Sequence, residues 1–180
     1  VINVTGDGKA YGNAQLIFTV SQANSDNAVD NAMVINVTDY GVMSIQRKGD
    51  SKANYFVVRG NQQLNLTNGK LEYATAGTLT VQGKGKFSMS GASTAEVSVM
   101  NVNDTASVVI DANSSLSVTE SLTIAEGASF SIDFTNYDFT KVSGNQTILS
   151  AGAITGNVAV IGGEKVAEAG YSLVNNGTSV

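Results

Sequence analysis

Two aspartates, Asp111 and Asp133, end two similar segments of the chain. The segments read ASVVID from residue 106 and ASFSID from residue 128, so they recur after 22 residues and agree at four of six positions. If they stack as neighbouring strands, the two carboxylates lie about 4.8 Å apart, which suits a calcium site or an acid pair. Asp also commonly follows the last core residue of a strand and begins a turn, and we interpret both residues in this way.

A basic cluster is the second candidate for chemistry. Arg47, Lys48, Lys52 and Arg59 surround Asp50 in the sequence. Polysaccharide lyases built on β-helices combine a Lys or Arg base with acidic metal ligands, and this cluster contains those residue types. The chain has no His and no Cys, so acid–base catalysis near neutral pH needs a Lys or a carboxylate with a strongly shifted pKa. We therefore predict a protein without catalytic residues, metal ligands or cofactor-binding residues.

Four tyrosines, Tyr11, Tyr40, Tyr55 and Tyr137, lie outside the regular alternation of the chain and are candidates for contact with a glycan. A tyrosine ring packs on the apolar face of a sugar, and nearby Asn and Asp side chains bond to its hydroxyl groups. Half-buried strands also favour Tyr, so a purely structural interpretation stays open. The segment GGEK at 162–165 lacks the glycine spacing of a nucleotide-binding loop, and we predict a turn there.

Composition narrows the class of protein. The chain has 180 residues, the size of one domain, and only 14% are charged, compared with about 25% in an average globular protein. With 19 Gly and no Pro, it is typical of a β-rich surface protein whose turns use Gly and Asn. A net charge of −5 with scattered basic residues argues against a nucleic-acid partner, and no apolar stretch is long enough for a membrane-spanning helix.

Seven Asn-x-Ser/Thr sequons follow from the abundance of Asn and Thr, and we do not interpret them as glycosylated. They begin at Asn3, Asn36, Asn65, Asn103, Asn113, Asn145 and Asn176.

Short alternating segments dominate from residue 70 onward and predict half-buried strands. They recur every six to eleven residues, which is too short for βαβ crossovers and leaves an antiparallel β-sandwich or a β-solenoid. The 22-residue repeat favours the solenoid, because stacked coils place similar residues one coil apart. We predict an all-β fold, a right-handed parallel β-helix with irregular coils, and keep the antiparallel β-sandwich as the alternative.

The alternation also predicts the inward-facing core. Val108 should stack beside Phe130, and Ile110 beside Ile132, in parallel strands. The predicted core positions are Leu71, Leu79, Val81, Phe87, Val97, Val108, Ile110, Leu116, Val118, Leu122, Ile124, Phe130 and Ile132.

The first sixty residues are less regular. The pentapeptide VINVT occurs at 1–5 and again at 34–38. Between the two copies, residues 21–31 are polar and without period, which predicts a long loop with room for a short helix over 28–33. No linker divides the chain, so we predict a single domain over 1–180.

From Ser107 onward the sequence resembles the passenger regions of bacterial autotransporters and related β-helical surface proteins. The closest segments are GNQTILSAGAITGN at 144–157 and GYSLVNNG at 170–177, and the similarity covers residues 70–180. The resemblance implies a β-helix at the bacterial surface or outside the cell, with no shared catalytic residues. We expect a structural or adhesive rod that presents loops to glycans or proteins. The alternative is a carbohydrate-binding or carbohydrate-degrading β-helix.

The two ends of the chain extend this expectation. The sequence starts inside a strand pattern without Met, and it stops at Val180, where the family has a further strand. We expect a fragment of a longer protein with an export signal upstream. Its contact with the membrane would come only through a β-barrel downstream. The isolated chain should associate end to end, because a terminal coil leaves unpaired backbone groups.

Overall fold

Short β-strands stacked in two sheets make up most of the chain. A computed structural model describes residues 1–9, 11, 14–20, 32–47, 55–73, 76–172 and 174. The strands are β1 (Ile2–Thr5), β2 (Gln15–Val20), β3 (Val34–Thr38), β4 (Val42–Arg47), β5 (Tyr55–Val58), β6 (Gln63–Thr67), β7 (Lys70–Tyr73), β8 (Thr78–Val81), β9 (Lys86–Ser90), β10 (Thr94–Val102), β11 (Ser107–Asp111), β12 (Ser115–Ile124), β13 (Ser129–Asp133), β14 (Leu149–Ala151), β15 (Ile154–Thr155) and β16 (Ala159–Ile161). The 3₁₀ helix η1 spans Phe139–Lys141 and the helix α1 spans Gly163–Glu168.

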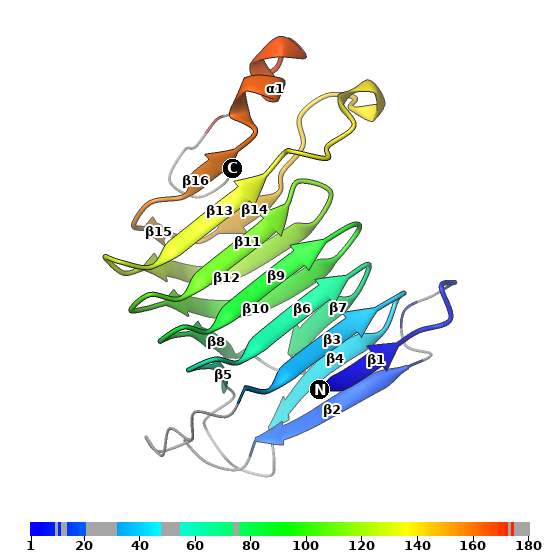
Figure 1. The fold of residues 1–180 in the computed structure, drawn as a ribbon, viewed down its shortest axis with the longest axis vertical. Helices are drawn as coiled ribbons and strands as arrows, with labels where there is room; N and C mark the ends of the chain where they lie inside the picture. The colour runs from blue at the N-terminus through cyan, green and yellow to red at the C-terminus, as the bar shows by residue number, and fades with distance from the viewer. Residues whose placement is uncertain are drawn as a thin grey trace.

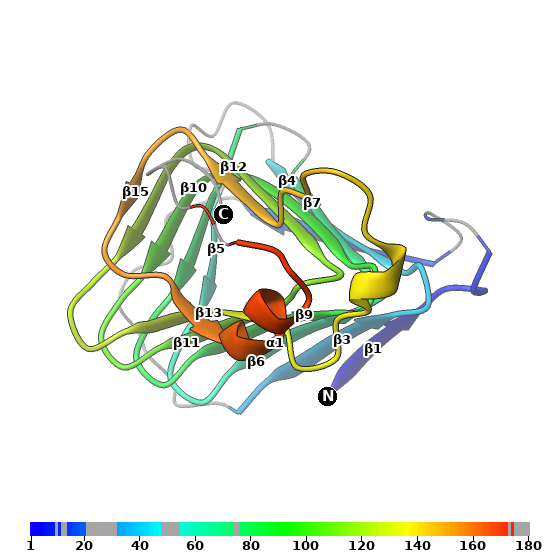
Figure 2. The ribbon, with the colours of Figure 1, turned by 90° about the horizontal axis from the view of Figure 1, so that it is seen from above.

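The first sheet has seven strands in the order β1-β3-β6-β9-β11-β13-β16, which is also their order along the chain (Figure 1). Between consecutive members of this sheet the chain passes through the second, nine-stranded sheet. That sheet has the order β14-β12-β10-β7-β4-β2, with β5, β8 and β15 joined at its side. Figure 2, which looks down the stack, shows the two sheets on opposite sides of the space they enclose.

Strand direction decides between the two predicted architectures. Every strand pair of both sheets is parallel in the described part of the chain. The fold is therefore all-β with parallel sheets, and the antiparallel β-sandwich is wrong for these strands. Val108 pairs with Phe130 and Ile110 with Ile132 in parallel strands, which confirms the predicted register.

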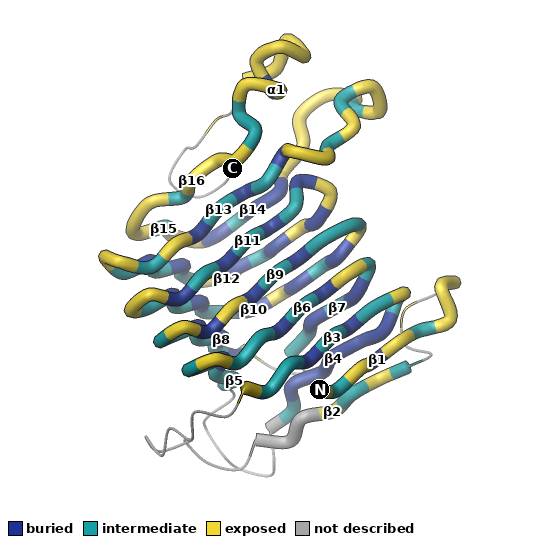
Figure 3. The backbone as a smooth tube through the Cα atoms, in the orientation of Figure 1, coloured by how far each residue is buried: buried dark blue, intermediate teal, exposed yellow. Residues whose placement is uncertain are grey.

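The hydrophobic core lies between the sheets, and the side chains alternate between core and surface along each strand (Figure 3). All thirteen predicted core residues are buried, each with 6% or less of its surface exposed, so the alternation assigned the two faces correctly. The buried side chains form one continuous cluster that runs from Val4 to Val166.

The longest strands, β10 and β12, differ from the expectation of short separate segments. In β12 two alternating segments, which begin at Ser115 and Ser121, form one strand of ten residues. The register between β10 and β12 shifts between Val97 and Val99. At this shift β12 contains one residue more than β10. Each of the two long strands pairs with one neighbour at its start, β7 or β14, and with another further on, β8 or β15.

Regular stacking also includes the start of the chain, where the sequence predicted less order. The two VINVT copies pair in register as β1 and β3, and β6 continues the series. Their outward asparagines form a ladder: the Asn36 amide donates to Asn3 Oδ1 at 2.9 Å, and the Asn65 amide donates to Asn36 Oδ1 at 3.0 Å. The Ser88 hydroxyl donates to Asn65 Oδ1 at 2.8 Å. The expected loop at 21–31 lies outside the described residues, as does most of the expected helix over 28–33.

Close packing of the backbone explains Gly69 and Gly85, which directly precede β7 and β9. A Cβ at Gly69 would lie 2.4 Å from the carbonyl oxygen of Val37, and one at Gly85 would lie 2.4 Å from that of Val58. No side chain fits at these distances, so the chain can pass from sheet to sheet there only at Gly.

The C-terminal part ends in a short helix that the sequence did not predict. We expected a turn over residues 162–165, but α1 begins at Gly163, after Gly162 in a left-handed conformation with φ of 73°. Six residues with one buried side chain, Val166, are too few to produce a recognisable helical period. Neither helix within the described ranges has the length and apolarity needed to cross a lipid bilayer.

Replacing Phe130 by Ala should lower the free energy of unfolding by about 3–5 kcal/mol, because the side chain is 1% exposed and leaves a cavity between the sheets. The neighbouring Ser131→Ala, on the outward face, is the matched control and should cost under about 0.5 kcal/mol. Urea unfolding of both variants measures the difference, and equal losses would mean that the faces are assigned wrongly.

Candidate functional site

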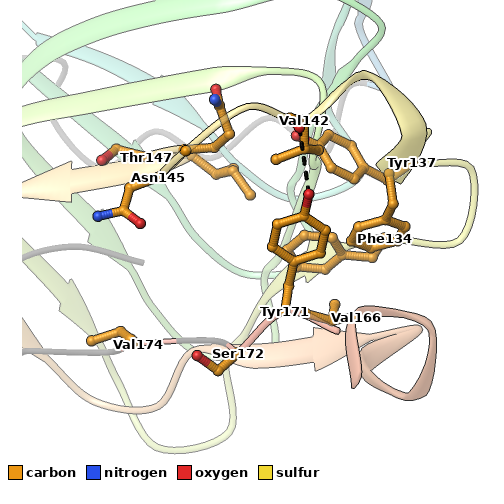
Figure 4. Close-up of a pocket in the computed structure, with 13 residues that line it drawn as sticks. Phe134, Tyr137, Val142, Asn145, Thr147, Val166, Tyr171, Ser172 and Val174 are labelled. Carbon is orange, nitrogen blue, oxygen red and sulfur yellow. Dashed lines mark hydrogen bonds between the residues drawn. The ribbon is translucent and has the colours of Figure 1, made fainter. Parts of the chain in front are cut away.

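A cavity of about 320 Å³ lies at the C-terminal end of the stack (Figure 4). Two stretches of the chain line it, one after β13 and the other at and after α1. The lining residues are Phe134, Tyr137, Phe139, Val142, Gly144, Asn145, Gln146, Thr147, Ile148, Val166, Tyr171, Ser172 and Val174.

Four aromatic rings form one wall of this cavity. Phe134, which directly follows β13 and is buried, has its ring centroid 5.7 Å from that of Tyr137 in an edge-to-face arrangement. Tyr137 and Phe139 meet edge to face at 4.9 Å, and Phe139 stacks on Tyr171 at 5.9 Å. Such pairs each contribute about 0.5–1.5 kcal/mol beyond the burial of area, so the cluster holds the two stretches together.

Polar contacts fix the segment that carries these rings. The Asp138 carboxylate caps η1 by accepting the Thr140 hydroxyl at 2.6 Å and the Thr140 backbone N–H at 3.1 Å. It also pairs with the Lys141 ammonium at 3.1 Å. The Thr140 hydroxyl, followed by Lys141, holds the pKa of Asp138 below its usual value, so this carboxylate is ionised at neutral pH.

Uncharged polar groups border the open part of the cavity. In Figure 4, Asn145 and Thr147 lie on one side, Ser172 and Val174 on the other, and Tyr171 stands between them. The Tyr171 hydroxyl donates to the carbonyl oxygen of Val142 at 3.4 Å and so joins the two stretches. Among the lining residues that the structure describes there is no Asp, Glu, Lys or Arg. The described lining is therefore aromatic and aliphatic, with neutral amide and hydroxyl groups.

The structure distributes the four predicted tyrosines over three places. Tyr11 and Tyr40 meet edge to face at 5.0 Å, and the Tyr11 hydroxyl donates to the carbonyl oxygen of Ala92 at 3.0 Å. Tyr55 is half-buried on β5, beside Thr78 of β8. Only Tyr137 belongs to the cavity.

Sequence reasoning did not select Phe134, Asn145 or Tyr171 as site residues. A signal for two of them existed, because Asn145 and Tyr171 lie in the two segments that carry the family resemblance. Their spacing in the sequence does not indicate that Asn145 and Tyr171 line the same cavity, because they are 26 residues apart and α1 lies between them.

Asp111 and Asp133 pair in register, as the 22-residue repeat predicted. Asp111 Oδ1 accepts the backbone N–H of Asn113 at 2.7 Å, and Asp133 Oδ1 accepts that of Thr135 at 2.8 Å. Both carboxylates therefore have the turn-forming role that we predicted. Within the described ranges, no group of three or more His, Cys, Asp or Glu side chains comes close enough to hold a metal ion.

The basic cluster stays a sequence prediction. Lys48, Asp50 and Lys52 lie outside the described residues, and the Arg47 side chain is not described. Arg59 follows β5 in a turn, where its backbone N–H donates to the side-chain oxygen of Gln62 at 3.2 Å.

Comparisons with protein-family models, with curated proteins and with solved structures find no significant match to this chain. The class that the fold defines is an all-β protein with parallel sheets.

Removing calcium should leave stability unchanged, because Asp111 and Asp133 bond to their own turns. Within the described ranges no third His, Cys, Asp or Glu joins them to form a metal site, and calcium prefers six or more oxygen ligands. We expect the same melting temperature with calcium and with a chelator. Asp111→Ala should cost about 0.5–1.5 kcal/mol through loss of the turn bonds, whereas Asp111→Asn, which keeps an acceptor oxygen, should cost less. A melting temperature that falls sharply in chelator would contradict the turn interpretation.

Tyr73, on β7, predicts a pH effect. It packs against the core, its hydroxyl donates to the carbonyl oxygen of Thr78 at 3.0 Å, and loss of hydration raises its pKa well above the ordinary value. The unfolded chain ionises this group near pH 10 and the folded chain only at higher pH, so the folded state holds more protons there. Its contribution to stability is present below about pH 10 and falls by about 1.4 kcal/mol per pH unit above it.

Tyr73→Phe separates this effect from general alkaline unfolding. The variant should be less stable at neutral pH by about 0.5–1.5 kcal/mol, because it loses the hydrogen bond. Above pH 10 its unfolding free energy should fall less steeply than that of the native chain. Parallel curves from urea titrations at several pH values would refute the assignment.

Proposed function

We propose that the two sheets are faces of a right-handed parallel β-helix, and that the chain is a structural or adhesive segment of an exported bacterial surface protein. The chain alternates between the sheets and returns each time to the next strand of the seven-stranded sheet. Connections between parallel strands of one sheet are right-handed in about 98% of cases, which supports the handedness.

The observation that carries this proposal is the uninterrupted parallel stacking of β1, β3, β6, β9, β11, β13 and β16. A stack in which each unit contacts mainly its neighbours extends in one direction, and units can be added without changing the core. Such an architecture suits a spacer that holds a surface away from the cell. The segments 144–157 and 170–177, which resemble passenger regions, support the location.

The outward faces fit a role in display. On the seven-stranded sheet they carry rows of Asn, Thr and Ser, in which the Asn3–Asn36–Asn65 ladder satisfies its own hydrogen bonds. In a second row Thr38 donates to Thr5 at 3.1 Å, and Thr67 lies 3.0 Å from the Ser90 hydroxyl. Because these side chains already bond to each other, we expect partners such as glycans or proteins to meet the turns and ends instead.

A carbohydrate-binding domain is the second candidate function. The aromatic and amide-lined cavity beside Tyr137 favours it. A carbohydrate-degrading enzyme has less support, because the lining residues that the structure describes include neither the carboxylates nor the basic residues that such chemistry uses.

Antibodies raised against the purified chain should label intact cells of its source, because the proposal places it outside the cell. An antibody against a cytoplasmic protein is the control and should label only permeabilised cells. Labelling of the chain only after permeabilisation would overturn the surface role. Turnover of a polysaccharide by the purified chain, abolished by changing one acidic residue, would overturn the absence of catalysis.

A further inference from the structure

The described lining of the C-terminal cavity combines aromatic rings with neutral polar groups and contains no charged side chain. We propose that it binds a neutral sugar, either one pyranose ring or the terminal unit of a longer glycan. This inference rests on the proposed surface function and adds to it the site and the class of ligand.

Tyr171 provides the stacking surface. One side of its ring packs on Phe139, with the two planes inclined by 27°, while 40% of the residue stays exposed beside the cavity. The bond from its hydroxyl to Val142 fixes the direction of the ring. A rigid ring that is held from behind and open in front matches the flat C–H face of a pyranose, and it loses little conformational freedom on binding.

Three polar side chains stand where the hydroxyl groups of such a sugar would lie. Asn145, Thr147 and Ser172 are exposed, and their side chains have no hydrogen-bond partner among the residues that the structure describes. The Asn145 amide offers two donors and an acceptor oxygen, and each hydroxyl offers both functions. In Figure 4, Asn145 and Thr147 lie on one side of the cavity and Ser172 on the other, so one sugar ring could contact side chains on both sides.

The uncharged lining of the described part of the cavity favours a neutral ligand. The charged residues next to the aromatic wall in sequence, Asp133, Asp138 and Lys141, are not part of the described lining and have partners of their own. Asp138 pairs with Lys141, and Asp133 accepts the backbone N–H of Thr135. A ligand carboxylate or phosphate would lose water in the cavity without gaining a cation. The net charge of −5 on the chain adds repulsion. Hydroxyl groups can be satisfied by the amide and hydroxyl side chains alone.

The size is consistent with one or two rings. A volume of about 320 Å³ lies at the lower end of the range for small-molecule sites, which begins at roughly 300 Å³. The open side between Asn145 and Val174 leaves room for the rest of a glycan.

The test measures binding of the methyl glycosides of glucose, galactose, mannose and N-acetylglucosamine to the whole purified chain by saturation-transfer NMR and calorimetry. At least one should bind with a millimolar Kd. Asn145→Ala, which removes an exposed side chain without a partner, should weaken binding by about tenfold or more, equivalent to roughly 1.4 kcal/mol. Asn61→Ala, an exposed asparagine in the turn after β5, is the matched control and should bind as the native chain does.

Tyr171 variants separate the ring from its hydroxyl group. Tyr171→Phe should retain binding and Tyr171→Ala should abolish it, with circular dichroism melts to check that both fold. The methyl glycoside of glucuronic acid should bind more weakly than that of glucose. The proposal is overturned if no glycoside binds at millimolar concentration, if Asn145→Ala binds as the native chain does, or if the glucuronide binds equally well.

The result is independent of the cell-labelling experiment. Labelled cells without sugar binding would refute the cavity inference and leave the surface role in place. Sugar binding without surface labelling would do the reverse.

Discussion

Parallel, in-register pairing of the strands is the constraint on which the rest of this molecule depends. Each strand of the seven-stranded sheet places its residues beside the same positions of the next strand, so Val37 lies beside Leu66, and Leu66 beside Met89. A position that faces inward in one strand must therefore be apolar in all of them. A position at a corner must be small wherever the backbones approach closely, as at Gly69 and Gly85.

This constraint explains which parts of the fold the sequence predicts. Alternation is a local property, so the thirteen core residues and the pairing of Val108 with Phe130 follow from the residues alone. The stacking of β3 on β6 could not be predicted from the 22-residue repeat, because the paired residues of these strands are 29 residues apart. A longer loop between two coils costs little free energy, so the spacing of stacked strands can vary. The continuous strand β12 was missed because two consecutive exposed residues, Thr119 and Glu120, interrupt the alternation between Val118 and Leu122.

The candidate site was less predictable for a different reason. Asp111 and Asp133 were interpreted correctly because a turn is made by residues two positions apart, which a sequence displays directly. The cavity depends instead on where α1 turns the chain back towards Phe139, and a six-residue helix leaves little periodic signal. Tyr137 could be selected because it lies outside the regular alternation, whereas Tyr171 becomes relevant only through contacts between distant segments.

The asparagine ladder helps to determine the register in which neighbouring strands pair. Alternation of apolar and polar residues forbids a slip of one position, because every side chain would change face, but a slip of two positions preserves the faces. The amides of Asn3, Asn36 and Asn65, which bond in series, disfavour a two-residue slip, because it places each Asn beside Thr, Val or Gln and breaks the Asn–Asn bonds. The apolar core therefore limits the strands to registers that keep the same residues facing inward. The row of outward asparagine amides then selects one of these registers.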